Sequence, residues 1–256
     1  MLNRFREAKQ AEIAALRALS ERGEMPRAWY GHRPPFAARL RSRGPAALIA
    51  EFKRASPSMG DLNLELGPRE AAMLFAANGA AAMSVLTEET HFKGSLDYLG
   101  ACAGEALPLL RKDFLFDTLQ VAATAATPAS AYLLVVRMFP EGEQLREMIE
   151  TGRALGLEAV VEIFDERDLE LARQAGAEII QVNARDLDTL EVDHGNVRRL
   201  ISQGRPSELW IAASGVSTPE QVREAAEGGY DAVLVGTAIM TSDDPGAVVR
   251  SLAEAR

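Results

Sequence analysis

The feature that most constrains the fold is a regular alternation of short apolar runs with helix-like stretches. The runs are typical of strands buried on both faces, and they follow one another at intervals of about 21 to 36 residues. Helical patterns lie between them, for example over 69–78, 144–155, 166–175 and 219–227. The expected strands begin near Leu48, Met83, Pro108, Tyr132, Glu158, Ile179, Leu209 and Ala232.

Eight strands, each followed by a helix, predict an α/β protein with a single (β/α)8 barrel, the TIM barrel. The alternative is a doubly wound sheet. That fold usually carries a glycine-rich nucleotide turn after an early strand, and neither G-x-G-x-x-G nor G-x-x-x-x-G-K-[ST] occurs in this sequence. The barrel is therefore the favoured architecture.

The segment before the first strand is different in character. Apolar positions spaced through 2–22 predict one helix with a single packing face, and 36–43 predicts a second, short helix after a proline-containing loop. We expect one domain over 1–256, with a helical N-terminal extension at 1–46 that covers the mouth of a barrel formed by 47–256.

Net charge and cysteine content indicate which binding partners and which cellular compartment to expect. The net charge of −9 and the pI near 5.0 argue against general attraction to nucleic acid or to anionic membranes. Cys102 alone cannot form an internal disulfide, which suits a reducing cytoplasm. The sequence has no run of about 18 apolar residues that could span a membrane. Its N-terminus is charged and shows no signal-peptide pattern, so we expect a cytoplasmic protein.

Polar residues recur where the expected strands end, which is the face on which barrels carry their active sites. Glu51 and Lys53 are two apart on the first strand and therefore share a face, and the turn Ser-Pro-Ser-x-Gly follows them. The other strand ends contribute Lys112, Glu162, Asn183, Ser214-Gly215 and Gly236-Thr237. Their placement predicts a shared rim, although each is unremarkable alone.

These segments resemble indole-3-glycerol phosphate synthases of tryptophan biosynthesis. The first is an apolar run followed by Glu-x-Lys-x-x-Ser-Pro-Ser, over 47–58. The second is Ser-Val-Leu-Thr at 84–87 followed by Phe-Lys-Gly-Ser at 92–95, and the third is Leu-Leu-Arg-Lys-Asp-Phe at 109–114. The resemblance extends in order over essentially the whole chain, and it implies a cofactor-free carboxy-lyase.

The resemblance also implies residue roles. It makes Lys112 and Glu162 the acid/base pair, with Glu51, Lys53 and Asn183 completing the catalytic set. The implied substrate is a small anionic phosphosugar, and the implied assembly is a monomer or weak homodimer. The implied substrate-binding residues are Ser56, the ring-lining Phe92 and Phe114, the cation Arg185, and the phosphate-holding Ser214, Gly215, Gly236 and Thr237.

The implied chemistry explains these residue types. Ring closure needs a carbonyl protonated as an aryl carbon attacks it, and the Lys112 ammonium can supply that proton. After carbon dioxide leaves, a hydroxyl and the proton on the amine must be removed, and either Glu162 or Glu51 can accept that proton. The sequence does not decide which lysine protonates the departing hydroxyl. Crowded charges are expected to bring a lysine pKa toward a useful range.

Three positions depart from the family pattern. Ala213 stands where a Glu usually precedes Ser-Gly, Gln181 where a Gly is common, and Met59 where a Lys is frequent. Because the five catalytic positions remain, we expect a working but slower enzyme.

Two rival functions stay open at this stage. A phosphoribosylanthranilate isomerase-like barrel would be expected to use a Cys/Asp pair, and Cys102 lies ahead of the third strand, where it could not serve. A catalytically lapsed phosphosugar-binding barrel has only Ala213 in its favour. The three histidines show no ligand spacing, so no metal is expected.

Overall fold

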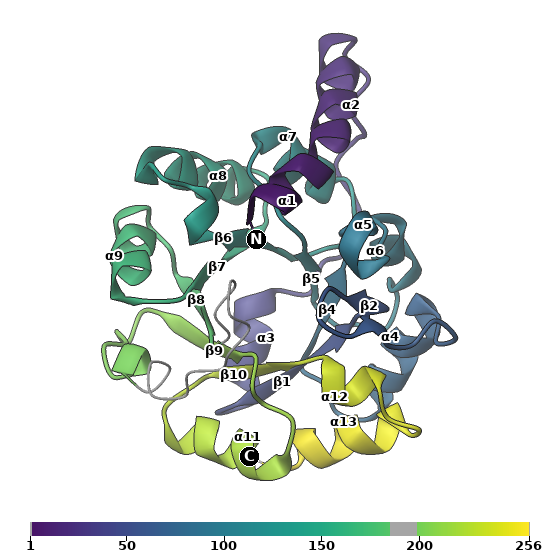
Figure 1. Cartoon of the computed structure of the whole chain (residues 1–256), viewed down its shortest axis with the longest axis vertical. Helices are drawn as coiled ribbons and strands as arrows, with labels where there is room; N and C mark the ends of the chain where they lie inside the picture. Colours follow the sequence, from purple (N-terminus) through teal and green to yellow (C-terminus); the bar gives the residue numbers. More distant parts are fainter. Residues whose placement is uncertain (1, 185–198, 256) are drawn as a thin grey trace.

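The computed structural model describes residues 2–184 and 199–255. Within these residues, parallel strands close into a barrel, with β1 hydrogen-bonded to both β10 and β4 (Figure 1). The predicted (β/α)8 barrel is confirmed, and each strand begins within one residue of its expected position. The barrel strands are β1 (Ala47–Phe52), β4 (Ala82–Leu86), β5 (Leu109–Lys112), β6 (Ala131–Val135), β7 (Glu158–Ile163), β8 (Ile179–Asn183), β9 (Leu209–Ala213) and β10 (Ala232–Val235).

Helices surround this ring (Figure 1). The starts of α7 (Thr118–Ala125) and α11 (Pro219–Glu227) are fixed by capping boxes. In these, the side chains of Asp117 and Thr218 accept backbone N–H groups, while the side chains of Gln120 and Gln221 accept the backbone N–H groups of Asp117 and Thr218. The helices after β1 are α4 (Pro68–Ala77), α5 (Glu89–Phe92), α6 (Asp97–Ala101), α7 (Thr118–Ala125), α8 (Gly142–Ala154), α9 (Glu166–Gln174), α11 (Pro219–Glu227), α12 (Thr237–Met240) and α13 (Pro245–Ala253), with a 3-10 turn η1 (Val136–Met138).

The strands are buried on both faces, as parallel strands covered by helices must be. Residues two apart on each strand point into the barrel, and the apolar ones among them fill its interior. Toward the carboxyl ends of the strands, charged side chains replace the aliphatic ones at Glu51, Lys112 and Glu162. This change of character places the candidate site.

The N-terminal extension contacts both ends of the barrel. Helix α1 (Leu2–Ala8) lies over one edge of the mouth, whereas α3 (Phe36–Ser42) lies behind the ring (Figure 1). The Glu158 carboxylate, at the start of β7, accepts the backbone N–H of Phe36 at 2.6 Å and that of Ala37 at 3.2 Å. A carboxylate at a helix N-terminus satisfies donors that the helix cannot, so this contact fixes α3 to the barrel.

The prediction of a single helix over 2–22 is wrong in one respect, the continuity of the helix. It is divided at Lys9 into α1 and α2 (Gln10–Glu21). The Lys9 side chain is 5% exposed and forms ion pairs with Glu12 and Asp113. The periodicity of apolar residues cannot predict this break, because Asp113, the ion-pair partner of Lys9, follows β5 and is far away in sequence.

Candidate active site

A cavity of about 450 Å³ lies at the carboxyl ends of the barrel strands. It is lined by all of the expected site residues that the structure describes. Arg185, the remaining one, lies outside the described residues. The expected residues lining the cavity are Glu51, Lys53, Ser56, Phe92, Lys112, Phe114, Glu162, Asn183, Ser214, Gly215, Gly236 and Thr237.

The floor of the cavity holds a carboxylate between two ammonium groups. Lys53 Nζ lies 3.1 Å from Glu51 Oε1, and Lys112 Nζ lies 3.6 Å from Glu51 Oε2. The Glu51 side chain is only 4% exposed, whereas that of Lys112 is 21% exposed and reaches the open part of the cavity. Strands β1 and β5, which lie on either side of β4, therefore bring together charges some sixty positions apart in sequence.

These contacts set the protonation states. Burial alone would raise the pKa of Glu51, but the Lys53 and Lys112 ammonium groups outweigh burial and hold that pKa below its usual value. Burial would lower the pKa of Lys112, but Glu51 and then Glu162 outweigh it and raise that pKa. The expectation that crowded charges bring a lysine pKa toward a useful range is not met at Lys112: its pKa is raised and the side chain is held as a cation, which is the form that can donate a proton.

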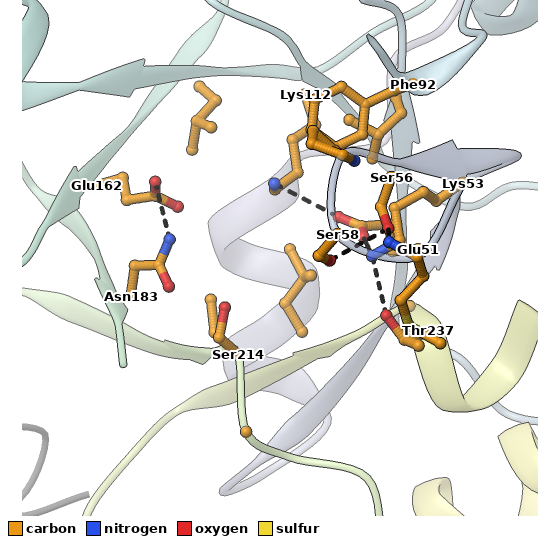
Figure 2. A pocket seen from close by; sticks show the side chains of 18 of the residues that line it. Glu51, Lys53, Ser56, Ser58, Phe92, Lys112, Glu162, Asn183, Ser214 and Thr237 are labelled. Carbon is orange, nitrogen blue, oxygen red and sulfur yellow. Dashed lines mark hydrogen bonds and ion pairs between the residues drawn. The ribbon is translucent and has the colours of Figure 1, made fainter. Parts of the chain in front are cut away.

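A second carboxylate occupies the other side of the cavity. Figure 2 shows Glu162 and Asn183 on one side, the Glu51, Lys53 and Thr237 group on the other, and Lys112 between them. Asn183 Nδ2 donates to Glu162 Oε1 at 3.2 Å, and Gln181 Nε2 donates to Glu162 Oε2 at 2.5 Å. Glu162 is 4% exposed, so both of its oxygens need such partners.

Small residues shape the cavity after β9 and β10. A Cβ added to Gly236 would lie 2.4 Å from Glu51 Oε1, so only glycine permits this approach of backbone to carboxylate. Thr237 begins α12, and its hydroxyl accepts a hydrogen bond from Lys53 Nζ at 3.2 Å. Ser214 and Gly215 have positive φ values of 64° and 80°, which turn the chain sharply as β9 ends.

An aromatic wall, formed by Phe5, Phe92 and Phe114, closes the cavity on the side of the N-terminal extension. Phe5 of α1 stacks on Phe114, with ring centroids 3.8 Å apart and planes 8° apart, and Phe92 lies 6.4 Å from Phe114. Sequence reasoning placed Phe5 on the packing face of a helix but missed it as a lining residue. No local signal could identify it, because the contact depends on how the extension folds back over the mouth.

A buried charged network behind Lys112 was also missed. Arg111 is 1% exposed, and its guanidinium donates to Asp113 Oδ2 at 3.0 Å, Glu12 Oε1 at 2.9 Å and Thr87 Oγ1 at 3.2 Å. Arg111 points away from the cavity because it precedes Lys112 on the strand. The network therefore ties the end of β5, where Lys112 lies, to the N-terminal extension.

The rival isomerase-like reading receives no support from Cys102. That thiol is buried ahead of β5, donates to the carbonyl of Pro68 at 3.3 Å, and is absent from the cavity lining. Burial raises its pKa to about 12, so it cannot act as a base near neutrality. Among residues 2–184 and 199–255, no group of three or more His, Cys, Asp or Glu residues could hold a metal, and no helix is long and apolar enough to cross a membrane.

Comparison with known sequences extends these observations. A family model described as Indole-3-glycerol phosphate synthase matches residues 2–252. The indole-3-glycerol phosphate synthase of Desulfosudis oleivorans is 41% identical over 85% of this chain and 84% of its own length. The one from Roseiflexus sp. is 39% identical over 98% of this chain and 97% of its own. Such similarity over nearly the full length is more than a shared fold produces.

Comparison with solved structures supports the architecture. The 3-hexulose-6-phosphate synthase of Salmonella typhimurium superposes with a TM-score of 0.66 over 82% of this chain and 97% of its own, at 16% identity. A tryptophan synthase alpha chain from Legionella pneumophila gives a TM-score of 0.60 over 86% of this chain and 95% of its own, at 14% identity. At these identities the likeness concerns the fold alone.

Proposed function

Because this chain belongs to the indole-3-glycerol phosphate synthase family, we propose that its cavity converts 1-(2-carboxyphenylamino)-1-deoxyribulose 5-phosphate to indole-3-glycerol phosphate. One observation carries the assignment of roles: Glu51, Lys53, Lys112, Glu162 and Asn183, distant in sequence, line the same cavity. The reaction closes a ring, releases carbon dioxide and releases water. It needs an acid and a base, and it needs no redox or metal chemistry.

The two ends of the substrate fit the two ends of the cavity. The phosphate is proposed to lie against the backbone N–H groups after β9 and β10, at Ser214, Gly215, Gly236 and Thr237, with Lys53 supplying positive charge. The aryl ring is proposed to lie against Phe92 and Phe114. Lys112 then lies between the two ends of the substrate, where the C2′ carbonyl belongs.

The first step is ring closure. The aryl carbon that carries the carboxylate attacks C2′, and Lys112 donates its proton to the carbonyl oxygen as the carbon–carbon bond forms. The carbonyl oxygen becomes a strongly basic alkoxide as the bond forms, so the Lys112 ammonium can donate to it although its pKa is raised. Carbon dioxide leaves next, and the electron pair of the broken bond restores the aromatic ring.

Dehydration completes the product. The C2′ hydroxyl leaves as water after taking a proton from an ammonium group, and the ring-closed intermediate gives up one proton to a carboxylate. We assign that carboxylate to Glu162, because Glu51 is already shared between Lys53 and Lys112 whereas the described partners of Glu162 are neutral amides. Asn183 orients Glu162 from within the cavity.

The charge of the chain bears on the partners and the cellular location of the enzyme. An acidic chain with net charge −9 suits a small anionic substrate drawn to a local cluster of cations rather than nucleic acid. We propose a cytoplasmic monomer or weak homodimer that binds no membrane and requires no cofactor. Sedimentation at micromolar protein concentration tests the oligomeric state. Activity assays with and without a chelator test whether the enzyme requires a metal cofactor.

The Lys112→Met variant tests the catalytic assignment. We expect turnover to fall at least about 100-fold, the low end of the contribution from general acid catalysis. Product formation is followed by indole fluorescence after adding the substrate, and circular dichroism checks the fold. Lys93→Met is the matched control, because Lys93 is half exposed and pairs only with Asp61 among the described contacts. Substantial activity in Lys112→Met would remove Lys112 from this role, and binding without turnover in the unmodified protein would favour the lapsed barrel.

A further inference from the structure

A buried amide lies beneath the carboxylate that we propose as the base. Gln181 of β8 is fully buried, and its register partner on β7 is Glu162. Gln181 Nε2 donates to Glu162 Oε2, while Asn183 Nδ2 donates to Glu162 Oε1. Each carboxylate oxygen therefore has its own amide donor.

The two amides differ in their access to substrate. Asn183 lines the cavity, so a bound substrate can compete for its hydrogen bond. Gln181 is absent from the lining and is 0% exposed. Its contact with Glu162 is therefore independent of what occupies the cavity.

The other end of the same amide is unusual. Gln181 Oε1 is buried and has no hydrogen-bond partner among the described residues. A buried acceptor without a partner is costly, and each such group in a folded protein calls for a reason. An amide carries a donor and an acceptor on opposite sides, so a half-turn of its terminal bond would exchange Nε2 for Oε1 beside Glu162.

We propose that Gln181 is a positioning residue that holds Glu162 in both of its protonation states, an inference that rests on the proposed role of Glu162 as base. In the resting site Nε2 donates to the carboxylate. After Glu162 accepts a proton from the ring-closed intermediate, the amide turns and Oε1 accepts the O–H of the carboxylic acid. The proton moves only between substrate and Glu162, and Gln181 neither gains nor loses one.

The Gln181→Met variant tests this proposal, because it keeps the length of the side chain and removes both donor and acceptor. Loss of the donor disfavours ionised Glu162, so we expect the acid limb of the kcat profile to move up by about one pH unit. We expect kcat near neutrality to fall about tenfold while KM stays within about twofold. Gln181→Glu is a second variant, in which two adjacent carboxylates should move the acid limb further.

Gln144→Met is the matched control, since the Gln144 amide donates to the carbonyl of Phe116 and does not line the cavity. It should leave the pH profile unchanged. A Gln181→Met enzyme with an unshifted acid limb and wild-type kcat overturns the proposal, as does a lower melting temperature without any change in the profile.

The Glu162→Gln variant, measured in the same assay, separates the two claims. If Glu162→Gln is inactive and Gln181→Met behaves as wild type, only the inference about Gln181 fails. If Glu162→Gln retains full turnover, the proposed base is wrong and the inference fails with it.

Discussion

Lys9 Nζ lies 2.8 Å from Asp113 Oδ2, and this contact joins the break between α1 and α2 to the residue that follows Lys112. Asp113 also accepts hydrogen bonds from Arg111 at 3.0 Å and from Thr87 at 2.6 Å. The N-terminal extension is thus attached to the barrel at the strand end that carries the proposed general acid. Stability of the extension and geometry of the site are linked through one buried carboxylate.

Removing Lys9 should destabilise the fold. In Lys9→Met, Asp113 keeps Arg111 as a partner, so we expect the free energy of unfolding to fall by about 1–3 kcal/mol rather than by the larger cost of an unpaired buried charge. Urea denaturation at pH 7 measures the change. Arg17→Met is the control, because the Arg17 side chain is 64% exposed in its pair with Asp117, and it should cost less than about 0.5 kcal/mol. Equal losses in the two variants would contradict the role given to Lys9.

The same carboxylate should make stability depend on pH. Burial alone would raise the pKa of Asp113, but Arg111 and Lys9 outweigh it and hold that pKa below its usual value. A depressed folded-state pKa contributes stability that is complete above the unfolded value of about 4 and is lost as the pH falls through the folded value. The stability difference between wild type and Asp113→Asn should therefore be largest near pH 7 and shrink below about pH 4. A difference that stays constant in denaturation series from pH 7 to pH 3 would refute this linkage.

The features of this protein that the sequence predicts are those determined by short segments of the chain. Strand starts follow from apolar runs, and residues such as Glu51 and Lys112 meet because parallel strands end at the same rim. Phe5 and the Arg111–Glu12 ion pair escaped prediction because these contacts depend on a fold-back of the N-terminal helices, which no periodicity encodes. The upward shift of the Lys112 pKa escaped prediction because it depends on the carboxylates of Glu51 and Glu162, whose distances from Lys112 are set by the closed barrel.

The aromatic wall predicts an effect on substrate binding. Phe5→Ala removes the ring that stacks on Phe114 and opens the cavity toward solvent, so we expect KM to rise about tenfold with a smaller change in kcat. Steady-state kinetics with the fluorescence assay separate the two constants. Tyr30→Ala is the control, since Tyr30 is 99% exposed and lies outside the cavity lining. An unchanged KM in Phe5→Ala would show that the aryl ring of the substrate does not depend on this wall.

A carboxylate restored at position 213 should speed the reaction. Ala213 ends β9, pairs in register with Asn183 and lines the cavity with only a methyl group. In Ala213→Glu the added charge would share the cavity with Lys53 and Lys112, whose positive charges offset its burial, and it can orient the substrate amine. We expect kcat to rise about two- to tenfold, which corresponds to at most about 1.4 kcal/mol of barrier. Ala213→Gln, equal in size but neutral, should give no gain. Equal gains in both variants would mean that side-chain shape rather than charge is limiting, and no gain in either would mean that the amides around Glu162 already compensate for the missing carboxylate.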